Sequence, residues 1–399
     1  MIAQFVLRSK IFTKILNFPK IILYLHDILV GRSRVISPLK LKNKAMSKQN
    51  RKFDPNAIIP DNGNYFGMPL TPEEAALVLI SAPWDTTVST RAGSSYAPDA
   101  IIEASRFIDF YEPTAPNSWR KGIATAPIDY SIQDLSHRLR SDADKIISLS
   151  HSDAEYVFEN IMHERRLRRI NEASMSVNDK IYKQAKQWLE RGKIVGLVGG
   201  DQSTAYGNIR AVGEHHEHIG ILHIDASCNL KEERYGFTHS HASIMHNVLR
   251  DVEAVDKLVS VGVREFSPRE WERAEQDERI RLFTGQYIWT QHFEGINWAT
   301  ITDEIVAELP EKVYISLDID GLTVECSPHT GTTISGGLRF PEVVYLFSKI
   351  VTSGRKIVGF DLTEVVPDVD DKTDAMIAAR LLFKMCSVAL KHAECDDVL

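Results

Sequence analysis

Val313-Tyr314-Ile315-Ser316-Leu317 is a short, mostly apolar run, followed at once by Asp318-Ile319-Asp320-Gly321. A run that is apolar at successive residues, rather than at alternate ones, is typical of a strand buried on both faces of a parallel sheet. The chain holds five further runs of this kind, at residues 76–81, 194–198, 219–224, 258–263 and 357–360. These six runs are the predicted strands.

Segments with helical spacing separate these strands. Val177, Ile181, Ala185 and Trp188 recur every three or four residues, the pattern of an amphipathic helix that leads into strand 194–198. The alternation of strands and helices predicts one α/β domain, doubly wound, with a mostly parallel sheet as the middle of three layers. Charged, Ser-rich sequence upstream extends the expected helical segment over about residues 131–191, and we interpret its charges as a solvated face.

Composition excludes several classes of protein. The 399 residues are 43% hydrophobic and 25% charged, with a net charge of −7. Because no part of the predicted domain is strongly basic, we expect no nucleic-acid partner. Four cysteines without a Cys-x-x-Cys pair indicate free thiols in an intracellular protein.

Residues 1–45 differ from the rest, because they hold nine Lys or Arg residues and one acidic residue, Asp27, a net charge of +8. Their apolar stretch is interrupted by Pro19 and other breakers, so it is too short to span a bilayer and does not fit a secretory signal. We therefore expect no membrane association. The extension is either a basic organelle presequence or an over-extended start, with the protein beginning at Met46. The predicted domain is 46–399 and the predicted location is the cytoplasm, with organelle targeting left open.

Polar residues follow four of the predicted strands. In open α/β sheets, ligands bind at the carboxyl ends of the strands. Several carboxylates that converge there repel one another unless a cation lies among them, so the pattern predicts a metal site. Each motif by itself is weak evidence, because Asp-x-Asp arises by chance and Gly-Gly-Asp forms simple turns. The four motifs are 199–203 (Gly-Gly-Asp-Gln-Ser), 225–229 (Asp-Ala-Ser-Cys-Asn), 318–321 (Asp-Ile-Asp-Gly) and 361–364 (Asp-Leu-Thr-Glu).

In this order the motifs resemble those of the ureohydrolases, the family of arginases, agmatinases, formimidoylglutamases and guanidine hydrolases. The resemblance covers residues 75 to 390 and implies an arginase-like fold. Further matching segments are Pro83-Trp84-Asp85, Ser240-His241-Ala242-Ser243, Thr330-Gly331-Thr332, Gly336-Gly337-Leu338 and Glu364-Val365-Val366-Pro367.

The resemblance implies a site for two Mn or Ni ions that share a hydroxide, and this chain keeps only half of its ligands. Asp225, Asp318 and Asp320 match retained metal ligands. The remaining ligand positions, two His and one Asp in the family, hold Gln202, Ser227 and Asn229 here. Because the substituted positions offer weaker ligands, we expect at most one weakly bound divalent cation. Because the retained donors are all oxygen, we expect this cation to be Mn or Mg.

The substrate side of the site is better retained. Glu364 matches the family's guanidinium-binding glutamate, and His241 matches a loop histidine that relays protons, although His241 can also be read as a structural loop residue. The His-rich cluster 214–218 precedes a strand at its amino end, so we interpret it as a solvated turn.

Two functions follow from the resemblance. The first is a catalytically impaired pseudoenzyme that keeps the guanidino-binding pocket (catalytic-type residues His241 and Glu364) and acts through partners in a homo- or hetero-oligomer. The alternative is an active metal-dependent hydrolase of guanidino or amidine C–N bonds, similar to agmatinase or guanidine hydrolase. The three substituted ligand positions favour the first function, and the retained carboxylates favour the second.

Overall fold

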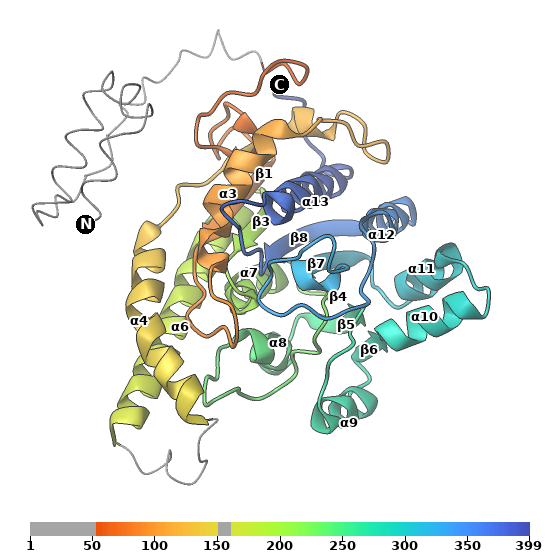
Figure 1. The fold of residues 1–399 in the computed structure, drawn as a ribbon. Coiled ribbons are helices and arrows are strands. Elements are labelled where there is room, and N and C mark those ends of the chain that lie inside the picture. Colours follow the sequence, from red (N-terminus) through yellow and green to blue (C-terminus); the bar gives the residue numbers. More distant parts are fainter. Residues whose placement is uncertain (1–52, 151–160) are drawn as a thin grey trace, which may run out of the picture. The chain divides into compact units, whose positions relative to one another are not determined.

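The computed structural model describes residues 53–150 and 161–399, so the predicted extension 1–45 lies outside the described residues (Figure 1). The described strands form one eight-stranded sheet in the order β2-β1-β3-β8-β7-β4-β5-β6, and every neighbouring pair is parallel. The strands are β1 (Leu77–Ala82), β2 (Ile123–Thr125), β3 (Ile194–Gly199), β4 (Ile219–Ile224), β5 (Val255–Val261), β6 (Ile280–Phe283), β7 (Lys312–Asp318) and β8 (Lys356–Thr363).

The prediction of a mostly parallel sheet is confirmed, and all six predicted strands are present. The strand predicted at 258–263 begins earlier, at Val255, and ends at Val261. The prediction missed β2 and β6, the two edge strands. Each is only three or four residues long, and β6 carries the exposed Arg281. Edge strands contact fewer apolar neighbours, so their sequences lack the continuous apolar run of a central strand.

Helices cover both faces of the sheet, which gives the three layers expected. Alternate residues of one strand pack on opposite faces: Leu77 and Leu79 join one apolar core, and Val78 and Ile80 join the other. The first core contains α3 (Ala97–Ala104), α10 (Gly285–Phe293), α11 (Trp298–Ala307), α12 (Phe340–Thr352) and α13 (Thr373–Leu390). The second core contains α4 (Tyr130–Ser150), α6 (Ile161–Leu189), α7 (Ala205–His216) and α8 (Ile244–Asp251), with α9 (Pro268–Gln276) at its margin.

Helices α4 and α6 occupy most of the stretch 131–191 where helices are predicted, and residues 151–160 of it lie outside the described residues. Arg166 and Arg169 of α6 both pair with Asp142 of α4, at 3.3 Å and 3.6 Å. The arginine-rich part of α6 is therefore a solvated, ion-paired face. Among residues 53–150 and 161–399, no helix is both long and apolar enough to cross a membrane.

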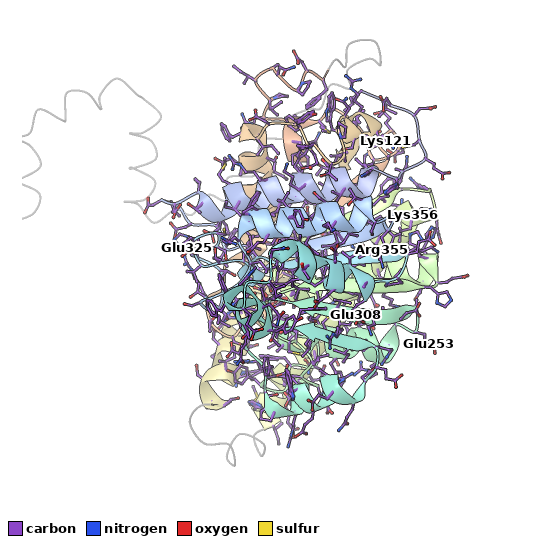
Figure 2. All side chains as sticks on the ribbon, turned by 90° about the vertical axis from the view of Figure 1, so that its right-hand side faces the viewer. Lys121, Glu253, Glu308, Glu325, Arg355 and Lys356 are labelled. Atoms are coloured by element: carbon purple, nitrogen blue, oxygen red, sulfur yellow. The ribbon has the colours of Figure 1, made fainter. Side chains whose placement is uncertain are left out.

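The amino ends and the carboxyl ends of the parallel strands lie on opposite sides of the sheet, which a side view separates. In Figure 2, Glu253 and Lys356, at the amino ends of β5 and β8, lie on the right, and Glu325, from the loop after β7, lies on the left. The four strands that carry the polar motifs are the adjacent strands β3, β8, β7 and β4. Their carboxyl ends therefore open onto one shared region.

Candidate active site

Three buried carboxylates meet at the carboxyl edge of the sheet. Asp225 follows β4, and Asp318 and Asp320 come from the end of β7. One oxygen of each lies within 4.8 Å of the others, and they are the described chain's single group of three or more His, Cys, Asp or Glu side chains arranged to share an ion. A backbone amide fixes each of them: Asp320 N–H donates to Asp318 over 2.9 Å, Ala226 N–H to Asp320 over 3.0 Å and Ser227 N–H to Asp225 over 2.6 Å.

A close approach of two chain segments brings the carboxylates together. Gly321 packs so tightly against the end of β4 that a Cβ atom there would lie 2.7 Å from the backbone nitrogen of Asp225. A glycine is therefore required at this position if Asp318 and Asp320 are to reach Asp225.

The cluster concentrates negative charge. Burial and the neighbouring carboxylates raise the pKa of Asp318 well above its usual range and raise the pKa of Asp320 to about 8. Arg264 partly offsets this charge, because its guanidinium lies near the cluster and donates to the backbone oxygen of Asp320 over 2.7 Å. A bound cation would neutralise the remaining charge.

Next to the carboxylates, the polar side chains of Asn229, Gln202 and His223 form a network of contacts with Asp225. Asn229 Nδ2 donates to Gln202 Oε1 over 2.7 Å and to Asp225 Oδ2 over 2.8 Å. His223 Nε2 lies 3.2 Å from Gln202 Nε2 and 2.9 Å from Asp225 Oδ2. Ser260 completes the network, with its Oγ 3.1 Å from His223 Nδ1. The structure thus places Gln202 and Asn229 beside the cluster, bonded to each other.

A cavity of about 210 Å³ opens above the carboxylates. Glu364 lines it from the end of β8, and Ser227, Asn229 and His241 line it together with the three Asp residues. Gln202 is buried beneath it and does not line it. Asp361, quoted with Glu364 in the sequence motif, lies inside β8 and accepts a hydrogen bond from Ser316 over 3.1 Å, so it is a core residue.

Glu364 is held in an unusual conformation. Its φ is 61°, in the left-handed region that costs energy for a side chain other than Gly, Asn or Asp, and such strain often occurs at functional sites. The Gln202 N–H donates to Glu364 Oε1 over 3.0 Å, and the Glu364 N–H donates to the Gly200 carbonyl over 2.8 Å. Burial, and then the nearby Asp201, raise the pKa of Glu364 well above its usual range.

His241 also lines the cavity, from the short 3₁₀ helix (His241–Ser243) before α8. Burial, and then the positive charge of Arg234, lower its pKa to about 4, so the ring is neutral near pH 7. Its Nδ1 is buried without a hydrogen-bond partner among the described residues, and its Nε2 is 3.5 Å from Ser89 Oγ. A neutral imidazole in this place can accept a proton.

With this geometry in view, comparison with known proteins decides the family. The model of the arginase family matches residues 75–387. The chain belongs to the arginase family. It is 30% identical over 323 residues to the N(1)-aminopropylagmatine ureohydrolase of Thermus thermophilus, an alignment that covers 80% of this chain and 92% of that protein. It is 25% identical over 308 residues to the agmatinase of Bacillus anthracis, with 77% and 89% covered.

Solved structures of arginase-family proteins share the fold. Proclavaminate amidino hydrolase of Streptomyces clavuligerus superposes with a TM-score of 0.64 at 20% identity, covering 84% of this chain and 99% of that one. Agmatine ureohydrolase of Thermoplasma volcanium gives 0.58 at 23% identity, with 81% and 93% covered. The predicted arginase-like architecture is confirmed.

Arginase-family proteins normally bind divalent metal, and the three buried carboxylates offer donors for such an ion. Asp225, Asp318 and Asp320 offer the hard oxygen atoms that Mn²⁺ and Mg²⁺ prefer. The neighbouring position, held by Gln202 and Asn229, offers weaker donors. Its occupants are neutral amides, and the Nδ2 group of Asn229 presents hydrogens rather than lone pairs to its neighbours.

Sequence reasoning missed several residues of this arginase-family site. His223 is a polar residue within the otherwise apolar β4, two positions before Asp225 and therefore on the same face of the strand, a signal that was available. Arg264, beside Asp320, and Lys231 and Arg234, at the cavity, come from loops, and no sequence pattern predicts where their side chains lie.

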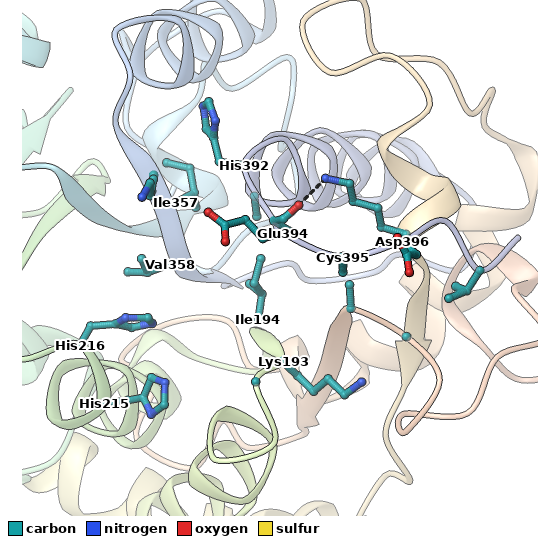
Figure 3. Close-up of a pocket in the computed structure, with 18 of the residues that line it drawn as sticks. Lys193, Ile194, His215, His216, Ile357, Val358, His392, Glu394, Cys395 and Asp396 are labelled. Atoms are coloured by element: carbon teal, nitrogen blue, oxygen red, sulfur yellow. Dashed lines mark hydrogen bonds between the residues drawn. The ribbon is translucent and has the colours of Figure 1, made fainter.

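A second cavity, of about 380 Å³, lies at the amino edge of the sheet. The C-terminal segment lines it, with His392 and Cys395, and His215 and His216 contribute from the end of α7 (Figure 3). The cluster 214–218 was predicted to be a solvated turn, but its residues 214–216 form the last turn of α7, where His215 is exposed and His216 is half-buried. The cluster lies at the amino edge, as predicted, away from the carboxylates.

Proposed function

We propose that this chain is an arginase-family protein that binds a guanidino or amidine ligand with at most one divalent cation, and whose hydrolytic activity is reduced or lost. The observation that carries this proposal is the 2.7 Å hydrogen bond from Asn229 to Gln202. Where the family resemblance leads us to expect a His and an Asp ligand, two neutral amides satisfy one another.

Asp225, Asp318 and Asp320 are the residues that would hold the single ion. Such an ion supplies positive charge that offsets the carboxylates and polarises a bound water. Ser227, which lines the cavity beside Asp225, offers only a neutral hydroxyl, so the ion lacks the nitrogen ligand that its family position would give it. Losing ligands of this kind weakens metal binding, which supports the expectation of weak affinity.

Glu364 is the expected partner of the ligand's guanidinium or amidinium group. A buried carboxylate with a fixed backbone is suited to a planar cation, because two parallel N–H groups can bond its two oxygens. The positive charge of the bound guanidinium or amidinium group would lower the raised pKa of Glu364, so ligand binding and ionisation of Glu364 favour each other.

An active hydrolase is the second candidate. His241 favours it, because a neutral histidine lines the same cavity as Glu364 and the carboxylates and can accept or return a proton. Hydrolysis of a guanidino or amidine C–N bond needs these groups and an activated water.

We also propose that the protein works in the cytoplasm as a homo- or hetero-oligomer. The four cysteines are free thiols, which suits a reducing compartment. Size-exclusion chromatography with light scattering measures the homo-oligomer, and affinity purification of the tagged chain identifies a paralogous partner.

One experiment separates the two functions. Metal content and Mn²⁺, Ni²⁺ and Mg²⁺ titrations are measured on the purified full chain, together with urea and ammonia release from agmatine, 4-guanidinobutyrate, arginine and guanidine. We expect at most one weakly bound ion per chain, lost in Asp318→Asn, and no turnover. Two tightly bound ions per chain would overturn the proposal of a single weak ion. Turnover that depends on His241 would establish the active hydrolase.

A further inference from the structure

Arg234 has an unused positive charge that faces the cavity. It lies between β4 and α8 and lines the same cavity as Glu364. Its Nε is buried without a hydrogen-bond partner, and no ion pair engages its guanidinium among the described residues. Lys231, three residues earlier, also lines the cavity, but its Nζ is paired with Glu270 at 2.8 Å. Of the two basic residues that line the cavity, Arg234 is therefore the one whose side chain has no ion-pair partner among the described residues.

The backbone holds Arg234 in place. Arg234 and Phe237 exchange two backbone hydrogen bonds, of 3.3 Å and 3.0 Å, across a two-residue turn. The turn residues Tyr235 and Gly236 have φ values of 58° and 82°, as a type I′ turn requires. Asn171 of α6 fixes the turn, donating to the Gly236 carbonyl over 3.0 Å and accepting from the Thr238 N–H over 3.1 Å.

The guanidinium is also restrained by stacking. Its central carbon lies 5.3 Å from the centre of the Tyr235 ring. A guanidinium held against an aromatic ring loses less freedom when it binds a planar anion, so the site is prepared for a carboxylate or phosphate. Glu265, an exposed carboxylate that also lines the cavity, makes no ion pair with Arg234.

The cavity is therefore bipolar. The acidic part of its lining is Glu364 with the Asp225, Asp318 and Asp320 cluster, and the basic part includes Arg234, whose positive charge lowers the pKa of His241. A ligand that satisfies both parts carries a cation at one end and an anion at the other. The volume of about 210 Å³ is below the usual range for drug-sized ligands and suits a small molecule.

We infer that Arg234 selects ligands with an acidic tail, so that the preferred ligands are ω-guanidino or amidino acids rather than guanidino amines. This inference deepens the proposed function and rests on it. The cationic head bonds Glu364, and the carboxylate or phosphate tail bonds Arg234 through two N–H groups.

The test compares three ligands that share a four-carbon chain and differ in the tail: 4-guanidinobutyrate (anionic), n-butylguanidine (neutral) and agmatine (cationic). Calorimetry measures their affinities for the full chain. We expect 4-guanidinobutyrate to bind about tenfold more tightly than n-butylguanidine, with agmatine weakest, the size expected for a hydrogen bond to a charged group. An analogue with a phosphate in place of the carboxylate tail shows which of the two acidic groups Arg234 binds more tightly.

Variants separate charge selection from folding. Arg234→Ala should lose the preference for the acid and leave n-butylguanidine binding unchanged, and Arg234→Glu should reverse the order in favour of agmatine. Arg168→Ala, an exposed arginine of α6 outside the cavity, is the matched control and should bind as the original chain does. Equal affinity for all three tails would overturn the inference alone. No binding of any guanidino compound by folded protein would overturn the proposed function, and this inference with it.

Discussion

Asn229 and Gln202 are bonded side chain to side chain, and the same Asn229 amide group also donates to Asp225. One Nδ2 group thus stabilises a buried carboxylate in a place where a cation would otherwise do so. Asn229 itself has a φ of 54°, a conformation that Asn tolerates and most other residues do not. Gln202 and Asn229 therefore satisfy each other's polar groups, and Asn229 also bonds Asp225.

Asn229→Asp should destabilise the protein without metal. The new carboxylate would lie beside Asp225 and Gln202 and could no longer donate, which costs about 1–3 kcal/mol of unfolding free energy. Added Mn²⁺ should recover the loss and raise the melting temperature of this variant more than that of the original chain. Thermal unfolding with EDTA and with Mn²⁺ checks this, with Asn229→Ala as the uncharged control. An equal response to Mn²⁺ in all three would contradict it.

The combined change Gln202→His, Ser227→His and Asn229→Asp should restore binding of two ions. It returns the nitrogen and carboxylate donors that the family resemblance assigns to these positions, beside Asp225, which is unchanged. Elemental analysis after dialysis should find two Mn per chain, against at most one for the original. If the folded triple variant holds no additional ion, the carry-over of the family site to these positions is wrong.

Gly321→Ala should separate the two halves of the carboxylate cluster. The added Cβ would lie 2.7 Å from the Asp225 nitrogen, so the segments must shift, at a cost of about 1–3 kcal/mol. Cation affinity should fall together with stability. Gly285→Ala is the matched control, because a Cβ there meets nothing closer than 3.4 Å. Denaturant unfolding and a metal titration measure both effects, and similar behaviour of the two variants would count against the close approach.

His329 should make stability depend on pH near neutrality. Its hydrogen bond to the buried Asp374, 2.7 Å from Nδ1, raises its pKa above the ordinary 6.5. This contact therefore stabilises the fold fully below pH 6.5 and loses its effect as the pH rises through the raised pKa. His329→Gln should lower the free energy of unfolding more at pH 5.5 than at pH 8.5, as measured by urea unfolding at both. A constant difference would argue against protonation of His329 in the folded state.

The central strands of the sheet were predictable because they are buried on both faces and must be apolar throughout. The same rule explains the two misses, since β2 and β6 lie at the edges and carry weaker patterns. The convergence of Asp225, Asp318, Asp320 and Glu364 was also predictable, because parallel neighbours end at the same edge. Arg234 and Arg264 were not, since loop conformation, and not periodicity, directs their side chains to the site.

By itself, the sequence determined the parallel α/β fold and the family, because these depend on local apolar patterns and on residue identity. Only the tertiary structure decided that Asn229 bonds Gln202, that Glu364 is held at a positive φ, and that Arg234 faces the cavity without a partner. These relationships join residues from different strands and loops, and packing alone sets the distances between them.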